Sequence, residues 1–402
     1  MRRFFIVLAM FVLGTVLALV LEWSNSQDGA AKVFSLFPEL KPQKEVVGFL
    51  PYWLLKKANQ VSLKALTQIT YFGLELSGDG SIIRNSTETE SEPGWYQLDN
   101  GTFSSIADTF PSTKRSLLIH QTKVAVIDEL LSDATASAKN LVSVVEPVMK
   151  EQHFTDLNLD IETFQEASPE ARQSMTIFLR TVKGELQQKK LGTLTVELTV
   201  RSLISEELLD TVEVGEIADF VVLMAYDYRY VGSYLAGAVA PMGGAGEVIE
   251  YGVPESVELA VHSIPPEKLM LGIPLYGYEW ETLSYDPGSP VIPGTGKTAT
   301  LTRVAEELER CRNKEKKTDE VPESSESAQA LCIVGREEFT FSPYLILPPN
   351  EDSAIQQIYY EDEQSLNKKF ELAKKYELGG VAFWAIGYEE EGALDGVAQY
   401  MK

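Results

Sequence analysis

The sequence predicts a (β/α)8 TIM barrel that carries a small α+β insertion and follows an apolar N-terminal segment. The main observation is that eight short apolar runs alternate with helical patterns from residue 45 onward. Short apolar runs bounded by turn signals are typical of buried parallel strands, and amphipathic stretches between them supply the crossover helices. A chain of 402 residues is long enough for one large barrel. An open doubly wound sheet shows the same alternation and is the alternative fold.

The predicted strands and helices follow one another in a regular order. The strands are expected at residues 46–50, 69–74, 116–119, 154–162, 194–200, 220–226, 269–273 and 380–384. The helices are expected at 137–150, 168–190, 255–262, 301–312 and 364–376. The helix from 168 has a clear start signal, because Ser168 is a good N-cap and Pro169 suits the first helical position.

The segment between the seventh and eighth strands is too long for a single crossover. We expect an inserted subdomain at about 281–355, with strand character at 332–334 and 355–360. Residues 314–330 are polar and charge-rich, which indicates a mobile loop. Cys311 and Cys332 flank this loop. They either form one local disulfide or remain two free thiols.

The N-terminus has the features of a segment that directs export. Arg2 and Arg3 precede an uncharged apolar run at 4–21, and no small-residue cleavage site follows it. Residues 1–23 are therefore expected to be a membrane-spanning signal anchor, or else a cleaved secretory signal peptide, with 24–44 as a linker. A buried terminal helix is a third interpretation. Either export interpretation makes residues 45–402 extracytoplasmic, attached to the membrane or secreted.

Composition and motifs exclude several function classes. The net charge of −24 at pH 7 argues against nucleic acid as the main partner. Residues 294–298 resemble part of a phosphate loop, but Val291 replaces its first glycine, so no nucleotide is expected. The three histidines, His120, His153 and His262, lack the spacing of metal ligands. We expect no metal and no cofactor.

The fourth strand carries an unusual polar face. Successive side chains leave a strand on opposite sides, so Asn158, Asp160 and Glu162 share one face and apolar residues share the other. Carboxylates that point into a covered sheet are costly unless they are paired or used. We interpret these residues as the chemical centre. An exposed pair on an edge strand is the alternative.

Other strands end in aromatic and acidic residues, and a barrel draws its catalytic groups from such C-terminal strand ends. A cleft of aromatic rings and carboxylates suits a sugar, whose apolar faces stack on rings while its hydroxyls need acceptors. Ordinary packing or capping is the alternative for each of these residues. The candidates are Tyr52 and Trp53 after the first strand, Met224, Tyr226 and Asp227 at the sixth, Tyr276 and Trp280 after the seventh, and Trp384 at the eighth.

These motifs resemble those of glycoside hydrolase family 18, the chitinase-like barrels. The D-G-x-D-x-D-x-E pattern of that family is matched at Asp160 and Glu162, whereas Asn158 replaces an aspartate and Thr155-Asp156 replaces the D-G pair. The family's strand-three S-x-G-G is absent at 118–121. Three further motifs match, at Met224–Asp227, Gly272–Trp280 and Gly379–Trp384. Together with Val239–Pro241, the N-x-D-x-E form most resembles the bacterial branch of spore-cortex and cell-wall hydrolases.

The resemblance implies cleavage of β-1,4-linked N-acetylglucosamine glycans, in peptidoglycan or chitin, by a substrate-assisted retaining mechanism. It implies that Glu162 is the general acid and base and that Asp160 holds the substrate's acetamide. Tyr226 would donate to that acetamide, Asp227 would contact the sugar or water, and Trp384 would be the stacking floor. We expect Asn158 beneath Asp160 as its hydrogen-bond partner. A catalytically silent, lectin-like glycan-binding barrel is the alternative function.

Overall fold

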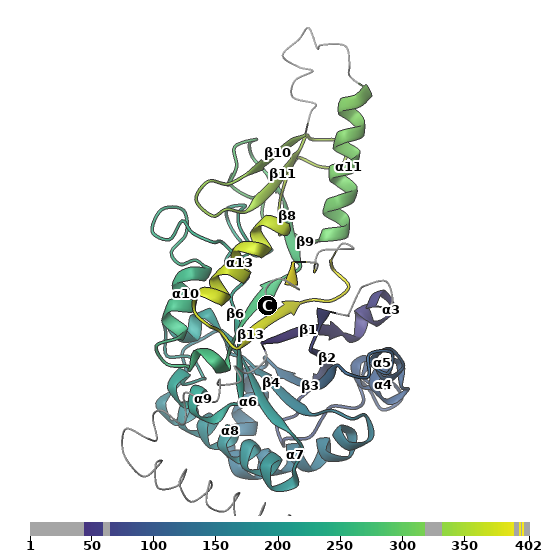
Figure 1. The fold of residues 1–402 in the computed structure, drawn as a ribbon, viewed down its shortest axis with the longest axis vertical. Helices are drawn as coiled ribbons and strands as arrows, with labels where there is room; N and C mark the ends of the chain where they lie inside the picture. Colours follow the sequence, from purple (N-terminus) through teal and green to yellow (C-terminus); the bar gives the residue numbers. More distant parts are fainter. Residues whose placement is uncertain (1–43, 59–64, 318–331, 390–393, 395, 398–402) are drawn as a thin grey trace, which may run out of the picture. The chain divides into compact units, whose positions relative to one another are not determined.

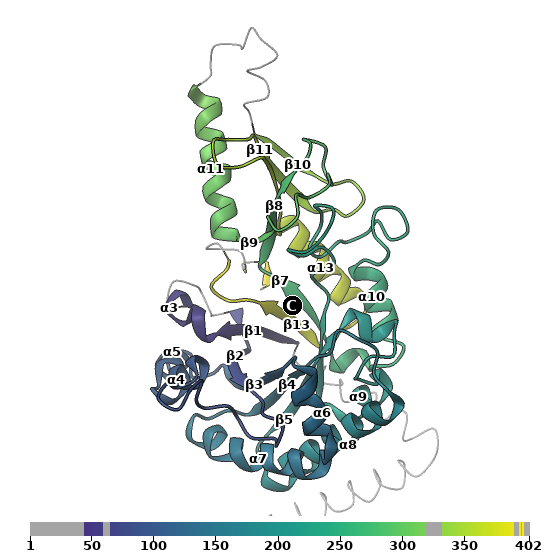
Figure 2. The same ribbon diagram turned by 180° about the vertical axis from the view of Figure 1, so that it is seen from behind.

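A closed barrel of eight parallel strands forms the centre of the protein. The computed structural model describes residues 44–58, 65–317, 332–389, 394 and 396–397 (Figures 1 and 2). Pairing of β1 with β13 closes the barrel in the order β1-β13-β7-β6-β5-β4-β3-β2, which excludes the open sheet. All eight predicted strands are confirmed. They are β1 Glu45–Pro51, β2 Gln68–Glu75, β3 Lys114–Gln121, β4 Asp156–Ile161, β5 Thr193–Thr199, β6 Phe220–Met224, β7 Leu269–Pro274 and β13 Gly380–Trp384.

Helices cover the outside of the barrel (Figure 1). Two of them illustrate how the sequence specifies them: α7 ends just before β4, and α8 begins after it and packs on α7. As predicted, Ser168 caps α8, because its Oγ accepts from the Ala171 N–H at 3.2 Å. The helices are α3 Leu55–Ala58, α4 Pro93–Asp99, α5 Thr102–Ala107, α6 Val124–Ser132, α7 Ala134–Glu151, α8 Pro169–Lys189, α9 Thr211–Ile217, α10 Val253–Ala260, α11 Leu301–Lys317 and α13 Glu363–Lys375.

Two apolar layers hold the strands. The larger layer lies between the strands and the helices and includes Leu157, Leu159 and Ile161 of β4. The smaller one fills the barrel interior with Val47, Phe49, Leu118, Val222, Met270 and Ala382. Since β4 sends its apolar side chains outward, its polar side chains must point into the barrel.

The predicted insertion is a five-stranded antiparallel sheet in the order β10-β11-β12-β8-β9. It begins at Tyr276, before the expected start at 281, and its last strand ends at Tyr359. Gly277 permits this early start, because a Cβ there would lie 2.0 Å from the Tyr359 carbonyl oxygen. The strands are β8 Tyr276–Thr282, β9 Lys297–Thr300, β10 Ile333–Arg336, β11 Pro343–Leu347 and β12 Ile355–Tyr359.

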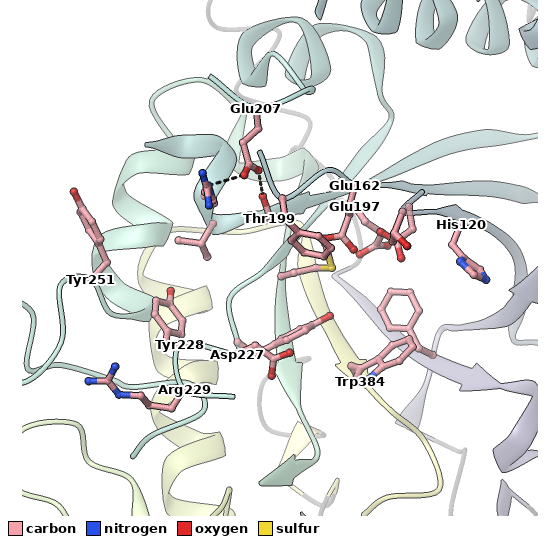
Figure 3. A pocket seen from close by; sticks show the side chains of 18 of the residues that line it. His120, Glu162, Glu197, Thr199, Glu207, Asp227, Tyr228, Arg229, Tyr251 and Trp384 are labelled. Atoms are coloured by element: carbon pink, nitrogen blue, oxygen red, sulfur yellow. Dashed lines mark hydrogen bonds and ion pairs between the residues drawn. The ribbon is translucent and has the colours of Figure 1, made fainter. Parts of the chain in front are cut away.

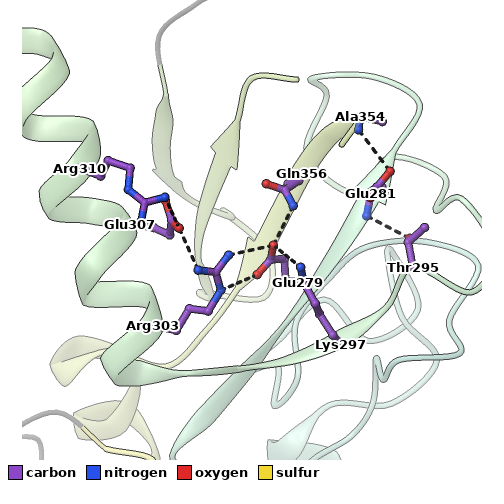
Figure 4. A network of polar contacts seen from close by, with 9 residues as sticks. All are labelled: Glu279, Glu281, Thr295, Lys297, Arg303, Glu307, Arg310, Ala354 and Gln356. Atoms are coloured by element: carbon purple, nitrogen blue, oxygen red, sulfur yellow. Dashed lines mark hydrogen bonds and ion pairs between the residues drawn. The ribbon is translucent and has the colours of Figure 1, made fainter. Parts of the chain in front are cut away.

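A buried charge network fixes α11 to this sheet (Figure 4). Glu279 on β8 is 1% exposed, yet its carboxylate is fully partnered. Arg303 of α11 donates to it through Nε at 3.0 Å, and the Lys297 Nζ lies 3.2 Å away. Gln356 of β12 adds a hydrogen bond at 2.9 Å. Two cations and an amide thereby offset the cost of burying the carboxylate.

A disulfide joins Cys311 to Cys332, with the two Cα atoms 5.8 Å apart. Of the two alternatives for these cysteines, a local disulfide and two free thiols, the structure therefore shows the disulfide. The helix α11 continues to Lys317, so the predicted loop is wrong at its start, where residues 314–317 are helical. The remainder of that loop, at 318–331, lies outside the described residues.

The predicted anchor or signal at residues 1–23 also lies outside the described residues, as does its linker up to residue 43. Within the part of the chain that the structure describes, no helix has the length and apolar character needed to cross a membrane.

Candidate active site

The C-terminal ends of the barrel strands surround a cavity of about 750 Å³ (Figure 3). This volume lies within the usual range for small-molecule sites, roughly 300–1,000 Å³. The cavity brings together residues from strands that are far apart in the sequence. Among the residues predicted for the site, those that line it are Asp160, Glu162, Met224, Tyr226, Asp227, Tyr276 and Trp384.

Asp160 and Glu162 form the polar centre of this cavity. Asp160 is 9% exposed and lies beside His120 of β3 in the strand register. Burial raises the pKa of both carboxyls, to about 7 for Asp160 and about 9 for Glu162. The negative charge of Asp160 also contributes to the rise in the pKa of Glu162. Glu162 therefore stays protonated near neutral pH and can serve as a proton donor.

Tyr226 reaches the cavity because β7 leaves room for its ring. A Cβ added at Gly272 would lie 2.6 Å from the Leu223 carbonyl oxygen and 3.0 Å from Cε1 of Tyr226. Burial raises the pKa of the Tyr226 phenol well above its usual value, and the nearby carboxylates raise it further. The phenol therefore stays protonated and can act as a hydrogen-bond donor.

Asp227 is held by the backbone and by two phenols. Its φ of 60° lies in the left-handed region, which aspartate tolerates better than most residues. Its Oδ1 accepts a hydrogen bond from the hydroxyl of Tyr276 and another from Tyr278 at 2.9 Å. Burial removes water from the Asp227 carboxyl and raises its pKa, whereas the hydrogen bonds from the two phenols act to lower it.

An aromatic wall forms one side of the cavity. The rings of Trp384 and Phe72 meet edge to face with centroids 4.9 Å apart. Phe72 stacks on His120 at 4.9 Å with an angle of 10° between the rings. Phe49 packs on Trp384 at 5.7 Å. Trp384 is only partly buried, so part of its ring remains accessible to a ligand.

Three predicted substrate-binding residues, Tyr52, Trp53 and Trp280, lie outside this cavity. Trp280 is fully buried, and its Nε1 donates to the Tyr230 carbonyl oxygen at 3.2 Å. The prediction that it contacts sugar is therefore wrong, because its ring belongs to the core between the barrel and the insertion. Tyr52 and Trp53 line a separate cavity of about 610 Å³. The rings of Trp53 and Phe72 meet edge to face, with centroids 5.7 Å apart.

Asn158 is also displaced from its predicted role. It is 0% exposed and does not line the cavity. Its Nδ2 donates to Oε1 of Glu197 at 2.7 Å rather than to Asp160. The predicted Asn158–Asp160 hydrogen bond is therefore wrong, because the side chain turns toward the neighbouring strand β5.

Several cavity residues were missed from the sequence, chiefly Glu197, Glu207 and His120. Glu197 had a signal, because Thr195, Glu197 and Thr199 alternate with apolar residues as the polar residues of β4 do. Glu207 comes from the loop after η3 (Val200–Leu203), and its carboxylate accepts from Thr199 at 2.9 Å (Figure 3). Among the described residues, no group of three or more His, Cys, Asp or Glu side chains is arranged to hold a metal ion.

Several known proteins are similar to this chain in sequence. The sequence profile described as "Glycosyl hydrolases family 18" matches residues 45–389. The cortical fragment-lytic enzyme of Bacillus anthracis is 26% identical over 328 residues, which is 80% of this chain and 65% of that protein. Its counterpart in Bacillus subtilis is 28% identical over 70% of this chain and 59% of its own length. The chain thus spans less than two thirds of these relatives.

Solved structures agree at the level of the fold. The Bacillus megaterium spore cortex-lytic enzyme SleL superposes with a TM-score of 0.66 at 22% identity, over 91% of this chain and 76% of that one. The Group IV chitinase of Ostrinia furnacalis gives a TM-score of 0.71 at 16% identity, over 89% of this chain and 99% of that one.

Proposed function

Because the chain belongs to family 18 of the glycosyl hydrolases, we propose that it cleaves β-1,4-linked N-acetylglucosamine glycans, with peptidoglycan favoured over chitin. The observation that carries this proposal is that the buried carboxyls of Asp160 and Glu162 line one cavity together with the phenol of Tyr226. The preference for peptidoglycan is supported by the similarity to cortical fragment-lytic enzymes.

The first chemical step uses the protonated Glu162. Its carboxyl would donate a proton to the glycosidic oxygen while the bond from that oxygen to the anomeric carbon breaks. The acetamide oxygen of the substrate would bond to the same carbon in place of an enzyme nucleophile. Asp160 would accept the acetamide N–H and stabilise the positive charge that develops there.

The second step returns the enzyme to its starting state. A water molecule would attack the anomeric carbon from the face that the leaving group vacated and give its proton to the Glu162 carboxylate. The acetamide oxygen then departs from the carbon. The product keeps the original configuration, and Glu162 is protonated again.

Three neighbours would orient the sugar. Tyr226 is a permanent donor because of its raised pKa, and it would hold the acetamide oxygen in line for attack. Asp227, fixed by two phenols, would accept from a sugar hydroxyl or from water. Trp384 would supply the flat surface on which the apolar face of the sugar stacks.

Product analysis with three glycans tests this function. The full chain is incubated with peptidoglycan, with chitin oligomers and with a glucosamine oligomer that lacks N-acetyl groups, and products are identified by mass spectrometry. We expect cleavage of the acetylated glycans only, because the mechanism needs the acetamide. An Asp160→Asn variant, matched in size, is expected to lose this cleavage. A folded protein that binds the oligomers but cleaves none would instead be the lectin-like barrel.

We also propose that the barrel works outside the cytoplasm, attached to the membrane through residues 4–21 or secreted after cleavage. Support comes from the basic and apolar N-terminus and from the Cys311–Cys332 disulfide, since such bonds persist in oxidising compartments. The intact mass of the exported protein distinguishes the two forms. Recovery of the protein only from the cytoplasmic fraction would contradict both.

A further inference from the structure

A third buried carboxyl lies beside the pair formed by Asp160 and Glu162. Glu197 of β5 is 2% exposed and lines the cavity near Glu162 (Figure 3). Asp160 lines the same cavity. Its Oε1 accepts the amide of Asn158 at 2.7 Å. Among the described residues, no lysine or arginine forms an ion pair with Asp160, Glu162 or Glu197. These three carboxyls therefore cannot all be ionised, and they must hold protons between them.

The surroundings of Glu197 differ from those of a structural carboxyl in the same barrel. Asp156 of β4 is equally buried, but three hydroxyls hold it, from Ser116 at 2.6 Å, Thr193 at 2.5 Å and Thr195 at 3.0 Å. Among the described residues, the only hydrogen bond to the Glu197 side chain comes from the Asn158 amide, which orients the carboxyl but can neither take nor supply a proton at this pH. A carboxyl that is oriented and otherwise free is suited to proton exchange.

The groups that face Glu197 identify its partner. These are Asp156, Asn158 and Asp160 on β4, Glu162 directly after β4, and the phenol of Tyr226 two residues after β6. The Oδ1 of Asp160 accepts no hydrogen bond from any described residue. Burial raises the pKa of Glu197, and its charge in turn raises the pKa of Asp160. The two carboxyls are thus coupled electrostatically.

We propose that Glu197 is a positioning residue that acts through Asp160, by holding the proton that Asp160 releases when it becomes the anionic partner of the substrate's acetamide. This inference rests on the proposed function. The proton leaves an Asp160 oxygen and binds a Glu197 oxygen as the sugar enters, and it returns when the product leaves. The N-x-D-x-E strand would thus obtain, from β5, the exchangeable carboxyl that Asn158 cannot provide.

A carboxyl-to-amide exchange tests the proposal. Glu197→Gln is isosteric and keeps a hydrogen-bonding group beside Asn158. We expect its kcat to fall by about tenfold or more, with a smaller change in KM. We expect the acid limb of the rate profile to move to lower pH, since the charge that raises the pKa of Asp160 is gone. A folded Glu197→Gln enzyme with an unchanged kcat and acid limb would overturn the proposal.

The swapped double variant separates proton exchange from packing. Asn158→Asp with Glu197→Gln places the carboxyl on β4 and the amide on β5, so the pair keeps its size and its hydrogen bond. We expect it to recover most of the lost kcat and to restore the acid limb. A folded double variant no better than Glu197→Gln would contradict the proposal. Glu166→Gln removes an exposed carboxylate and is the control, with an unshifted acid limb.

A measurement without turnover keeps this test apart from the proposed function. Carbon-13 NMR of labelled aspartate carboxyls follows the titration of Asp160, which is assigned with Asp160→Asn. We expect the Asp160 midpoint to fall in Glu197→Gln, whether or not a glycan is cleaved. An unmoved midpoint overturns the role of Glu197 alone, whereas inactivity of the wild-type chain on every acetylated glycan overturns the proposed function.

Discussion

Removing the two phenols that donate to Asp227 is expected to shift the pH dependence of activity. Tyr276 and Tyr278 both come from β8, and both hydroxyls bind Oδ1 of Asp227. A hydrogen bond to a charged group contributes about 1.5–3 kcal/mol. Water in the open cleft can replace a lost phenol, so we take the lower value of this range, about 1.5 kcal/mol for each hydrogen bond. This free energy corresponds to a change of about one unit in the pKa of Asp227.

The direction of this pH shift follows from the hydrogen bonds to Asp227. The phenols hold the raised pKa of Asp227 down, so Tyr276→Phe and Tyr278→Phe let it rise further. Asp227 is then protonated at a higher pH and stops accepting from the sugar. A neutral Asp227 also no longer raises the pKa of Glu162. We expect the acid limb of the kcat/KM profile to move up by about one unit for each phenol lost, with about tenfold less activity below it.

The assay is the pH profile of kcat/KM on a fluorogenic N-acetylglucosamine oligomer, with folding checked by circular dichroism. Tyr234→Phe is the control, because Tyr234 is 88% exposed. The double variant combines Tyr276→Phe with Tyr278→Phe. If it folds and its acid limb stays at the wild-type pH, the two phenols of the insertion do not lower the pKa of Asp227.

The remaining predictions concern stability and packing. Gly272→Ala places a methyl group 2.6 Å from a backbone oxygen of β6, so it should cost about 1–3 kcal/mol in urea unfolding and lower kcat. Arg303→Met leaves the buried Glu279 with Lys297 as its remaining cation, and the unfolding free energy should fall by about 3 kcal/mol, whereas an unchanged urea midpoint would contradict the network. Cys311→Ser opens the bridge to Cys332, and we expect a loss of about 2–4 kcal/mol, read from the thermal midpoint with and without reductant.

The barrel could be predicted because its signals are local. Each strand is a short apolar run, and alternation in β4 alone specifies which side chains point into the barrel. The same reasoning places Asp160, Glu162, Tyr226 and Trp384 on the cavity, since all lie at strand ends.

The errors concern partners that lie far away in the sequence. Trp280 follows β7 closely and was therefore expected at the barrel mouth, but β8 pairs with β12, and that pairing buries the ring. Asn158 was expected to bind within its own strand, whereas its amide crosses to Glu197 on β5. Glu197 itself was overlooked, although polar and apolar residues alternate along β5 as they do along β4. Such pairings depend on the register between strands, which single-sequence patterns do not contain.

The proposed function assigns Glu162 as the general acid and base of a glycosidase. The most direct test compares the rates at which the wild type, Glu162→Gln and Glu166→Gln release oligosaccharides from peptidoglycan and chitin oligomers. Glu166 follows on the same loop but is exposed, so it controls for loss of a carboxylate. We predict that Glu166→Gln matches the wild type and that Glu162→Gln is slower by at least about 100-fold. A folded Glu162→Gln protein that cleaves as fast as the wild type would contradict the account.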